Sequence, residues 1–227
     1  MPLGAELRQA FGTPIVVEND VRSAAWGEFR FGALRGAEGL IAVFIGTGVG
    51  SGAVLDGRLW RGAGNAAGEV GHTQVVPDGL PCPCGQRGCL ERYASGSGFQ
   101  QQLRAALATG TPTTLTARTR GDAGTLTAEM VYEAARAGDA VAHAIWDAAV
   151  RLLTMALANY VTVLNPRVLV LGGGVIESVP ALFDAVAADV PPRTTVLARG
   201  SLRIARAALG DWSGVVGAAD LARAAAR

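Results

Sequence analysis

Three cysteines and one of the two histidines lie within eighteen residues and carry the clearest chemistry in this sequence. His72 is followed by nine residues and then by Cys82, Cys84 and Cys89, in a segment rich in proline and glycine. Three thiolates and one imidazole fill a closed tetrahedral Zn²⁺ shell and leave no position for a catalytic water. Buried or redox-active thiols seldom cluster so tightly in such a loop, so we predict one structural zinc.

Two carboxylates flank this cluster. Glu69 lies three residues before His72, and Glu91 lies two residues after Cys89. A metal that fixes the loop would also fix these carboxylates, which could then bind another molecule. The cluster is therefore a candidate scaffold for a binding site.

Two glycine-rich segments follow apolar stretches that we expect to be buried strands. Residues 46–52 read Gly-Thr-Gly-Val-Gly-Ser-Gly and lead into an expected hairpin, which excludes the dinucleotide fingerprint because that motif opens a helix. Residues 172–174 are three glycines between a strand and a helix. Both segments could present backbone N–H groups to phosphate oxygens. A tight turn at the first and close helix packing at the second are equally good explanations.

Glu18, Asn19 and Asp20 follow a short apolar segment that we expect to be a strand, residues 15–17. Either Asn19 or Asp20 can cap the helix that begins there. The functional alternative is that Asp20 is a carboxylate at a strand end, able to serve as a general base.

The composition indicates a folded globular protein. Of 227 residues, 50% are hydrophobic and 17% are charged, and the net charge of +1 gives no electrostatic footprint for nucleic acid or an anionic membrane. Three cysteines without a signal-peptide pattern favour a reducing compartment, so we expect a cytoplasmic protein. The apolar stretch 140–164 is interrupted by polar residues, and we predict no membrane span.

Helical and strand patterns alternate along the second half of the chain, which predicts an α/β fold. We expect helices at residues 1–12, 20–31, 97–109, 127–137 and 139–164, one from about 176, and one at 213–226. The expected strands are 15–17, 40–45, 53–55, 59–60, 167–171 and 202–207. Residues 62–91 and 110–126 are expected to be loops.

Taken together, these motifs resemble the ROK family of sugar kinases, open reading frames and repressors. The matching segments are Glu18-Asn19-Asp20, residues 46–52, Gly64-x-x-x-Gly68-Glu69-Val70-Gly71-His72, Cys82-x-Cys84-Gly-x-x-Gly-Cys89-Leu-Glu91 and Leu171-Gly-Gly-Gly-Val175. They occur in the family's order and span nearly the whole chain. The resemblance implies the actin-like ATPase fold, which is ribonuclease H-like, with a hexose held between two lobes and Mg²⁺-bound ATP as phosphoryl donor.

The resemblance also implies roles for single residues. Asp20 would be the general base that takes the proton from the attacking sugar hydroxyl. The residues that would bind the sugar are Asn19, Asp20, Glu69, His72 and Glu91. His72 would bind zinc through one ring nitrogen and face the sugar with the other. The residues that would meet ATP are Thr47 and Gly48 at the phosphates, and Gly173 and Gly174 at the adenosine.

The family's first phosphate loop, an Asp-x-Gly-Gly-Thr motif, occurs nowhere in this sequence. The chain thus resembles a family member that lacks its N-terminal lobe. A misplaced start codon, a cloned fragment or a degenerate protein would each explain such a sequence. We expect residues 1–32 to be a remnant of the smaller lobe with the catalytic Asp20, and residues 33–227 to be the larger sugar- and ATP-binding lobe, with the zinc loop at about 62–91.

The expected function is ATP-dependent phosphorylation of a hexose by a glucokinase-like enzyme. The alternative is a catalytically inactive sugar-binding or regulatory protein. The expected partners are a hexose and ATP, with no nucleic acid and no membrane. The long helix and the family both favour a homodimer.

Overall fold

A five-stranded sheet of order β3-β2-β1-β4-β5 forms the centre of the protein. The structure is a computed structural model that describes residues 3–32 and 37–226. β1 (Gly39–Ile45) pairs antiparallel with β2 (Val49–Leu55), which pairs with the short β3 (Arg58–Leu59). β4 (Val168–Gly172) runs parallel to β1, and β5 (Arg203–Arg206) runs parallel to β4. β4 and β5 alternate with helices in the second half of the chain, and the predicted α/β class is confirmed.

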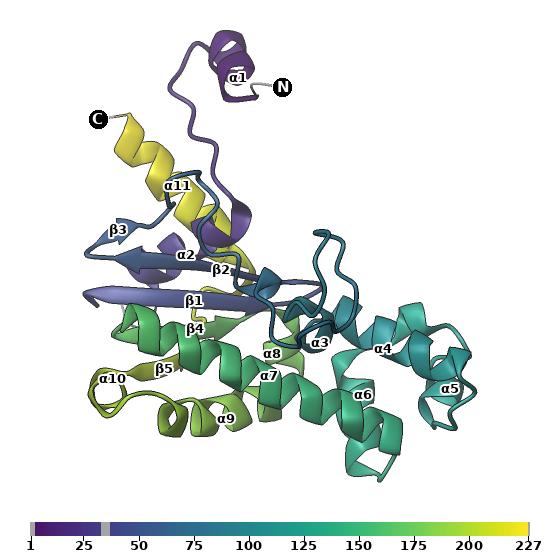
Figure 1. Cartoon of the computed structure of the whole chain (residues 1–227). Helices are drawn as coiled ribbons and strands as arrows, with labels where there is room; N and C mark the ends of the chain where they lie inside the picture. The colour runs from purple at the N-terminus through teal and green to yellow at the C-terminus, as the bar shows by residue number, and fades with distance from the viewer. Residues whose placement is uncertain (1–2, 33–36, 227) are drawn as a thin grey trace.

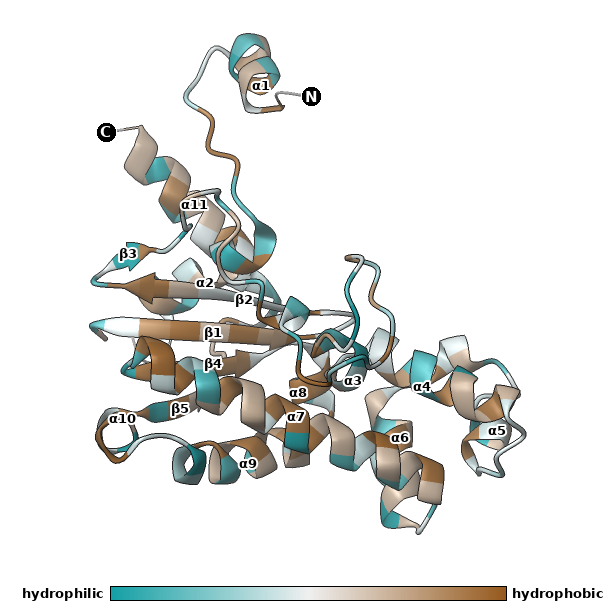
Figure 2. Cartoon of the chain, in the orientation of Figure 1, coloured by the Kyte–Doolittle hydropathy of each residue, from teal (hydrophilic) through white to brown (hydrophobic). Residues whose placement is uncertain are grey.

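Alternate residues of β1 face opposite helical layers, as a strand buried on both faces requires. Ile41, Val43 and Ile45 belong to the core under α7 (Ala140–Leu164), which crosses in front of the sheet in Figure 1. Leu40 and Ala42 pack on the other face, against α2 (Asp20–Phe31). Figure 2 shows β1 and much of α7 in hydrophobic colours. The sheet is therefore the middle layer of three.

The remaining helices lie mostly where the sequence pattern predicts. They are α1 (Leu3–Phe11), α3 (Glu91–Ala94), α4 (Gly96–Ala108), α5 (Leu115–Arg118), α6 (Ala128–Arg136), α8 (Gly174–Ser178), α9 (Pro180–Asp189), α10 (Val196–Ser201) and α11 (Ser213–Ala225). Short 3-10 turns occupy Val70–His72, Ala123–Thr125, Pro191–Arg193 and Gly210–Trp212. The predicted hairpin at Asp56 and Gly57 is confirmed, because β2 and β3 flank it.

α7 is the main helix of the core. By length and composition alone it could cross a membrane, yet half of its most apolar window is buried inside the protein. Its cap, Asp139, accepts hydrogen bonds from the Ala142 backbone and from Thr113 and Thr114. Burial alone would raise the pKa of Asp139, but these bonds outweigh it and lower the pKa to about 2. Because half of that window is buried, the apolar face of α7 packs into the core of this domain.

Three predictions about secondary structure are wrong. Residues 49–52 belong to β2 and not to a glycine loop, because they pair with residues 42–45 of β1. Residues 15–17 are extended, but no strand of the described residues pairs with them, and Val16 and Val17 are 37% and 52% exposed. β-branched residues favour a strand only where a neighbouring strand accepts their hydrogen bonds. The predicted loop 110–126 contains α5 and a 3-10 turn, because Leu115 and Leu126 anchor it in the core.

α1 stands apart from the rest of the molecule. The sequence predicts a helix over residues 1–12, and Leu3–Phe11 are helical, while residues 1 and 2 lie outside the described part. All residues of this helix are at least partly exposed. Figure 1 shows α1 joined to the body by the extended segment that leads to α2.

α2 and α11 cross so closely that their backbones touch. A Cβ atom at Gly27 would collide with the Ser213 carbonyl, and one at Gly217 with the Ser23 carbonyl. Beside the crossing, the buried carboxylate of Asp220 accepts hydrogen bonds from Trp26 Nε1 at 3.0 Å and from Arg30 Nε at 3.1 Å. Both crossing positions require glycine for this close contact. The contact holds α11 against α2, the helix that begins at Asp20.

Replacing Gly217 with alanine should destabilise the protein. The added methyl group meets backbone rather than a movable side chain, and overpacking of this kind costs about 1–3 kcal/mol of the free energy of unfolding. Urea unfolding followed by circular dichroism measures the change. The matched control is Gly200→Ala in α10, where a Cβ meets open space, so alanine should keep the stability or raise it. Equal stability of the Gly217→Ala variant and the wild type would contradict the close crossing.

Candidate active site and metal cluster

The four predicted metal ligands lie together. The ligand atoms of His72, Cys82, Cys84 and Cys89 are all within 4.8 Å of one another. Cys82 Sγ lies 3.6 Å from His72 Nδ1, and Cys84 Sγ lies 3.6 Å from Cys89 Sγ. Three sulfurs and one nitrogen at these separations suit a tetrahedral Zn²⁺ ion and complete its shell. The residues present therefore fit the predicted metal.

The thiols of the cluster lie in unlike surroundings. Burial raises the pKa of Cys89 to about 12, and the neighbouring thiols act in the same direction. A backbone hydrogen bond at Gln86 lowers the pKa of Cys84, which is exposed. A coordinated cation removes the proton of a thiol outright. Thus Cys89 can carry the charge of a thiolate when a cation lies between the four ligands.

Both ends of the metal loop are fixed to the start of β2. Gly71, next to His72, lies so close to the Val49 carbonyl that a Cβ atom there would collide with it. At the other end, Glu91 Oε2 accepts a hydrogen bond of 3.1 Å from the Val49 backbone. Gly71 and Glu91, near the two ends of the loop, therefore both lie against Val49 of the sheet.

Asp20 begins α2 without acting as its cap. The cap is Asn19, whose Oδ1 accepts a 2.9 Å hydrogen bond from the Arg22 backbone. Asp20 is exposed, and its Oδ1 accepts a bond from the adjacent Val21 backbone at 2.8 Å. The Val21 side chain lies against Gly50 of β2. The N-terminus of α2 therefore lies beside the same start of β2.

The neighbouring Glu18 is a buried anchor for this helix start. Its carboxylate pairs with Arg22 Nε at 2.7 Å and with Arg61 Nε at 2.6 Å, and its side chain is only 4% exposed. Burial raises its pKa, but hydrogen bonds from the Asn19 backbone and both guanidinium groups outweigh burial and lower it. Arg22 also donates to the Asn65 carbonyl at 2.8 Å. These bonds join the helix start to the loop that leads to Glu69.

The two glycine-rich segments meet at the carboxyl ends of β1 and β4. Gly46 to Gly48 form a turn between β1 and β2, closed by a 2.9 Å bond from the Gly46 N–H to the Gly48 carbonyl. The Ser97 N–H donates to the Thr47 carbonyl at 3.2 Å, so the first turn of α4 supports the tip. Gly173 has φ +89° and contacts the Ile45 backbone. Parallel strands of open α/β sheets bind ligands at this edge.

A cavity of about 220 Å³ opens at this edge and is lined by four parts of the chain. α2 contributes Asp20, the ends of β1 and β4 contribute Phe44 and Gly173, and the segment after β5 contributes Asp211. The complete lining is Asp20, Val21, Ala24, Phe44, Gly173, Glu177, Gly210, Asp211, Ser213 and Gly214. Of the predicted site residues, Asp20 and Gly173 are thus brought to one cavity.

The other residues predicted to bind the sugar or the nucleotide do not line this cavity. They are Asn19, Thr47, Gly48, Glu69, His72, Glu91 and Gly174. The segment 210–214 also lines the cavity and is not among the predicted site residues. Its signal was present, since Gly210 and Asp211 follow the last strand and precede a helix in an α/β pattern.

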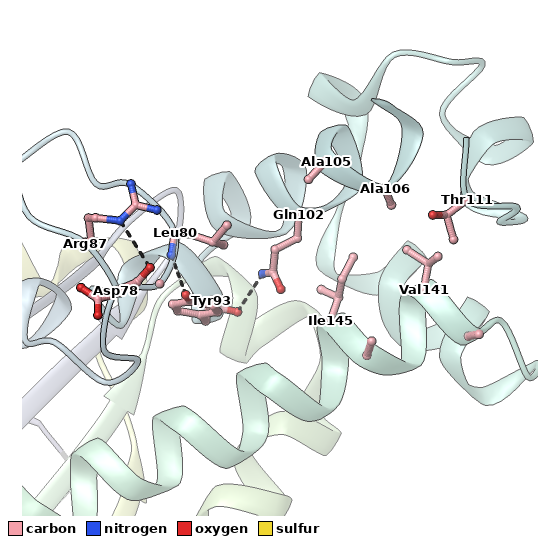
Figure 3. A pocket seen from close by; sticks show the side chains of 13 residues that line it. Asp78, Leu80, Arg87, Tyr93, Gln102, Ala105, Ala106, Thr111, Val141 and Ile145 are labelled. Atoms are coloured by element: carbon pink, nitrogen blue, oxygen red, sulfur yellow. Dashed lines mark hydrogen bonds between the residues drawn. The ribbon is translucent and has the colours of Figure 1, made fainter. Parts of the chain in front are cut away.

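A larger cavity, of about 690 Å³, is lined by residues of the metal loop, α4 and α7 (Figure 3). The metal loop contributes Asp78, Leu80 and Arg87, and α4 and α7 contribute mainly alanine, valine and isoleucine. Leu80 N–H donates to the Tyr93 hydroxyl at 2.8 Å, which holds the loop to α3. None of the predicted site residues is among the described residues that line it. The strand ends are therefore the better candidate for chemistry.

The family model described as "ROK family" matches residues 1–225. The glucokinase of Streptomyces coelicolor is 35% identical over 229 residues, which cover 98% of this chain and 71% of that protein. A crystal structure of a ROK family glucokinase from Streptomyces griseus, in complex with glucose and AMPPNP, superposes with a TM-score of 0.78 and 36% identity, over 98% of this chain and 72% of that one. The Escherichia coli DNA-binding transcriptional repressor Mlc is 32% identical over 84% of this chain and 45% of its own length.

Purified protein should contain about one zinc ion per chain. Three thiolates and one imidazole can surround the ion tetrahedrally and leave no coordination position open. Cys89→Ala should reduce the zinc content at least about tenfold, since it removes the most buried ligand. Elemental analysis after dialysis measures both. The matched control is Gln86→Ala in the same loop, an exposed side chain outside the ligand set, which should keep its zinc. Wild-type protein with far less than one zinc would rule the site out.

Proposed function

The chain belongs to the ROK family, and on that premise we propose that it phosphorylates a hexose with ATP, as a glucokinase-like sugar kinase. The observation that carries the proposal is the cavity shared by Asp20 and Gly173 at the carboxyl ends of the parallel strands. It offers a carboxylate on one side and glycine backbone on the other. Phosphoryl transfer needs both a group that receives the hydroxyl proton and backbone that admits phosphates. The fold shared with the solved ROK structures, one of which holds glucose and AMPPNP, supports the proposal.

In the proposed mechanism, Asp20 accepts the proton of the attacking sugar hydroxyl. Its carboxylate is exposed and lines the cavity. Asn19, and not Asp20, caps α2, so the Asp20 carboxylate is not used as the helix cap. The Gly46–Gly48 turn and Gly173 let the nucleotide approach the backbone closely, and Thr47 lies at the tip of the turn. Mg²⁺ bound with the nucleotide supplies charge neutralisation at the phosphates. Catalysis is then mainly positioning.

The sugar is proposed to bind where the metal loop meets the start of β2. Asn19, Glu69, His72 and Glu91 are the residues proposed to bind its hydroxyls. Carboxylate, amide and imidazole groups suit hydroxyls, which both donate and accept hydrogen bonds. Glu69 is exposed, and its carboxylate makes no hydrogen bond or ion pair within residues 3–32 and 37–226. A structural Zn²⁺ would hold the loop in place for this contact.

Three further features stay proposals: a smaller-lobe remnant at 1–32 beside a larger lobe at 33–227, a homodimer and a cytoplasmic location. The junction of the two units adjoins residues 33–36, which lie outside the described part. α2 packs against α11 and β2, so Asp20 is carried by a helix that rests on the larger unit.

The second candidate is a sugar-sensing regulator without kinase activity. The match to the repressor Mlc over 84% of this chain supports it. The net charge of +1 favours the kinase, since DNA-binding regions are usually strongly basic. Hexose binding without phosphoryl transfer would favour the regulator.

Replacing Asp20 with asparagine should lower glucose phosphorylation by about 10²–10⁴-fold, the usual contribution of a general base. Glucose binding should stay within about threefold, since the amide keeps a hydrogen-bonding group of the same shape. A coupled assay with Mg²⁺-bound ATP measures turnover, and calorimetry measures glucose binding. Asp56→Asn, in the exposed hairpin turn, is the control and should keep full turnover. Full turnover in the Asp20→Asn variant would refute the role, and a wild type that binds glucose without turnover would support the regulator.

Replacing Glu69 with glutamine should weaken glucose binding by about tenfold or more, because a hydrogen bond to a charged group contributes about 1.5–3 kcal/mol. Because Glu69 is exposed, the variant should keep the stability of the wild type, and a thermal melt checks this. Glu6→Gln on the exposed α1 is the control and should bind glucose like the wild type. Unchanged glucose affinity in the Glu69→Gln variant would remove Glu69 from the sugar site.

A further inference from the structure

A second carboxylate of α2 is buried and bonded to a distant segment. Glu28 is 2% exposed, and its Oε1 accepts hydrogen bonds from the Leu209 backbone at 2.9 Å and from Ser213 Oγ at 2.9 Å. The Ala208 backbone donates to Oε2 at 3.0 Å. All these donors are neutral and lie 180 residues or more further along the chain. The carboxylate therefore joins the segment between β5 and α11 to α2.

The segment that Glu28 holds is one wall of the candidate active site. Gly210, Asp211, Ser213 and Gly214 follow the bonded amides directly and line the 220 Å³ cavity with Asp20. Gly210 has φ +51°, so the chain turns sharply between the amides bonded to Glu28 and the start of α11. Ser213 belongs to both sets, since it bonds to Glu28 and lines the cavity.

One rigid element thus carries both Asp20 and the anchor of the opposite wall. Glu28 lies eight residues after Asp20, which is about 12 Å along a helix axis. At the end of α2, a Cβ atom on Gly32 would collide with Glu28 Oε2, so the absence of a side chain there leaves the carboxylate its place. The separation between the catalytic carboxylate and the 208–214 segment is fixed through α2.

We propose that Glu28 is a positioning residue that fixes the 208–214 segment as the nucleotide-side wall of the cavity. The inference rests on the proposed kinase function and assigns this residue a role in binding Mg²⁺-bound ATP. Glu28 touches neither substrate. It acts through the backbone of Ala208 and Leu209, which carry the segment that faces Gly173 and Asp20.

A purely structural role is the alternative, and the same helix pair contains a matched control. Asp220 is also a buried carboxylate between α2 and α11, at 6% exposure, and it bonds to Trp26, Arg30 and Arg223. None of these partners belongs to the 208–214 segment. Asp220→Asn should therefore weaken the helix pair without releasing the wall.

The first measurement is hydrogen exchange of the Ala208 and Leu209 amides, followed by NMR. In Glu28→Gln an amide N–H replaces one acceptor and can face the donor of Ala208, so both amides should exchange about tenfold faster. Asp220→Asn should leave their exchange within about twofold of the wild type. Ser213→Ala, a milder change that removes one bond to Glu28, should accelerate both amides by a smaller factor and covers the case in which Glu28→Gln does not fold. Unchanged exchange in the folded Glu28 and Ser213 variants, or equal acceleration in Asp220→Asn, would overturn the inference.

The second measurement separates the two ligands by calorimetry. Glu28→Gln should weaken binding of Mg²⁺-bound ATP by about tenfold and leave the Kd for glucose within about twofold, and Asp220→Asn should change neither. Equal weakening of both ligands would indicate a general structural effect and overturn the role. A wild type that binds no Mg²⁺-bound ATP would instead contradict the proposed function, and the amide exchange still decides whether Glu28 holds the segment.

Discussion

Gly27 of α2 and Gly217 of α11 lie where two helices cross with backbone against backbone. Because interiors are close-packed, a contact of this kind allows little adjustment. This contact packs α2, the helix that begins at Asp20, against α11. Glu28 of α2 also accepts hydrogen bonds from the segment between β5 and α11. The cavity that contains Asp20 is lined by residues of these same elements.

A second constraint acts at the start of β2. The metal loop returns twice to Val49, through Gly71 and through Glu91, and the first turn of α2 lies against the neighbouring Gly50. Segments that are up to 71 residues apart in the sequence, from Asp20 to Glu91, thus contact the same two residues at the start of β2. Small residues on β2 make this possible, because a larger side chain at Gly50 would displace Val21.

Much of the fold could be predicted from local patterns, and the failures have a common cause. The helices of residues 97–109 and 139–164 and the strand of residues 40–45 are encoded by periodicity and length, and the structure has them within one or two residues. Residues 15–17 have strand propensity, but a strand also needs a partner, and the described residues supply none. The turn of residues 115–118 depends on Leu115 reaching a core that no local pattern reveals.

The sequence by itself determined the metal cluster, since three cysteines and one histidine at close spacing can meet within one short loop. It also determined the family, through motifs distributed along the chain. Only the tertiary structure decided that Asn19 rather than Asp20 caps α2, and that Asp20 shares a cavity with Gly173 and the 210–214 segment. The roles of Glu28 and Gly217 were equally unreadable, because each depends on a partner some 180 residues away and long-range contacts leave no local pattern.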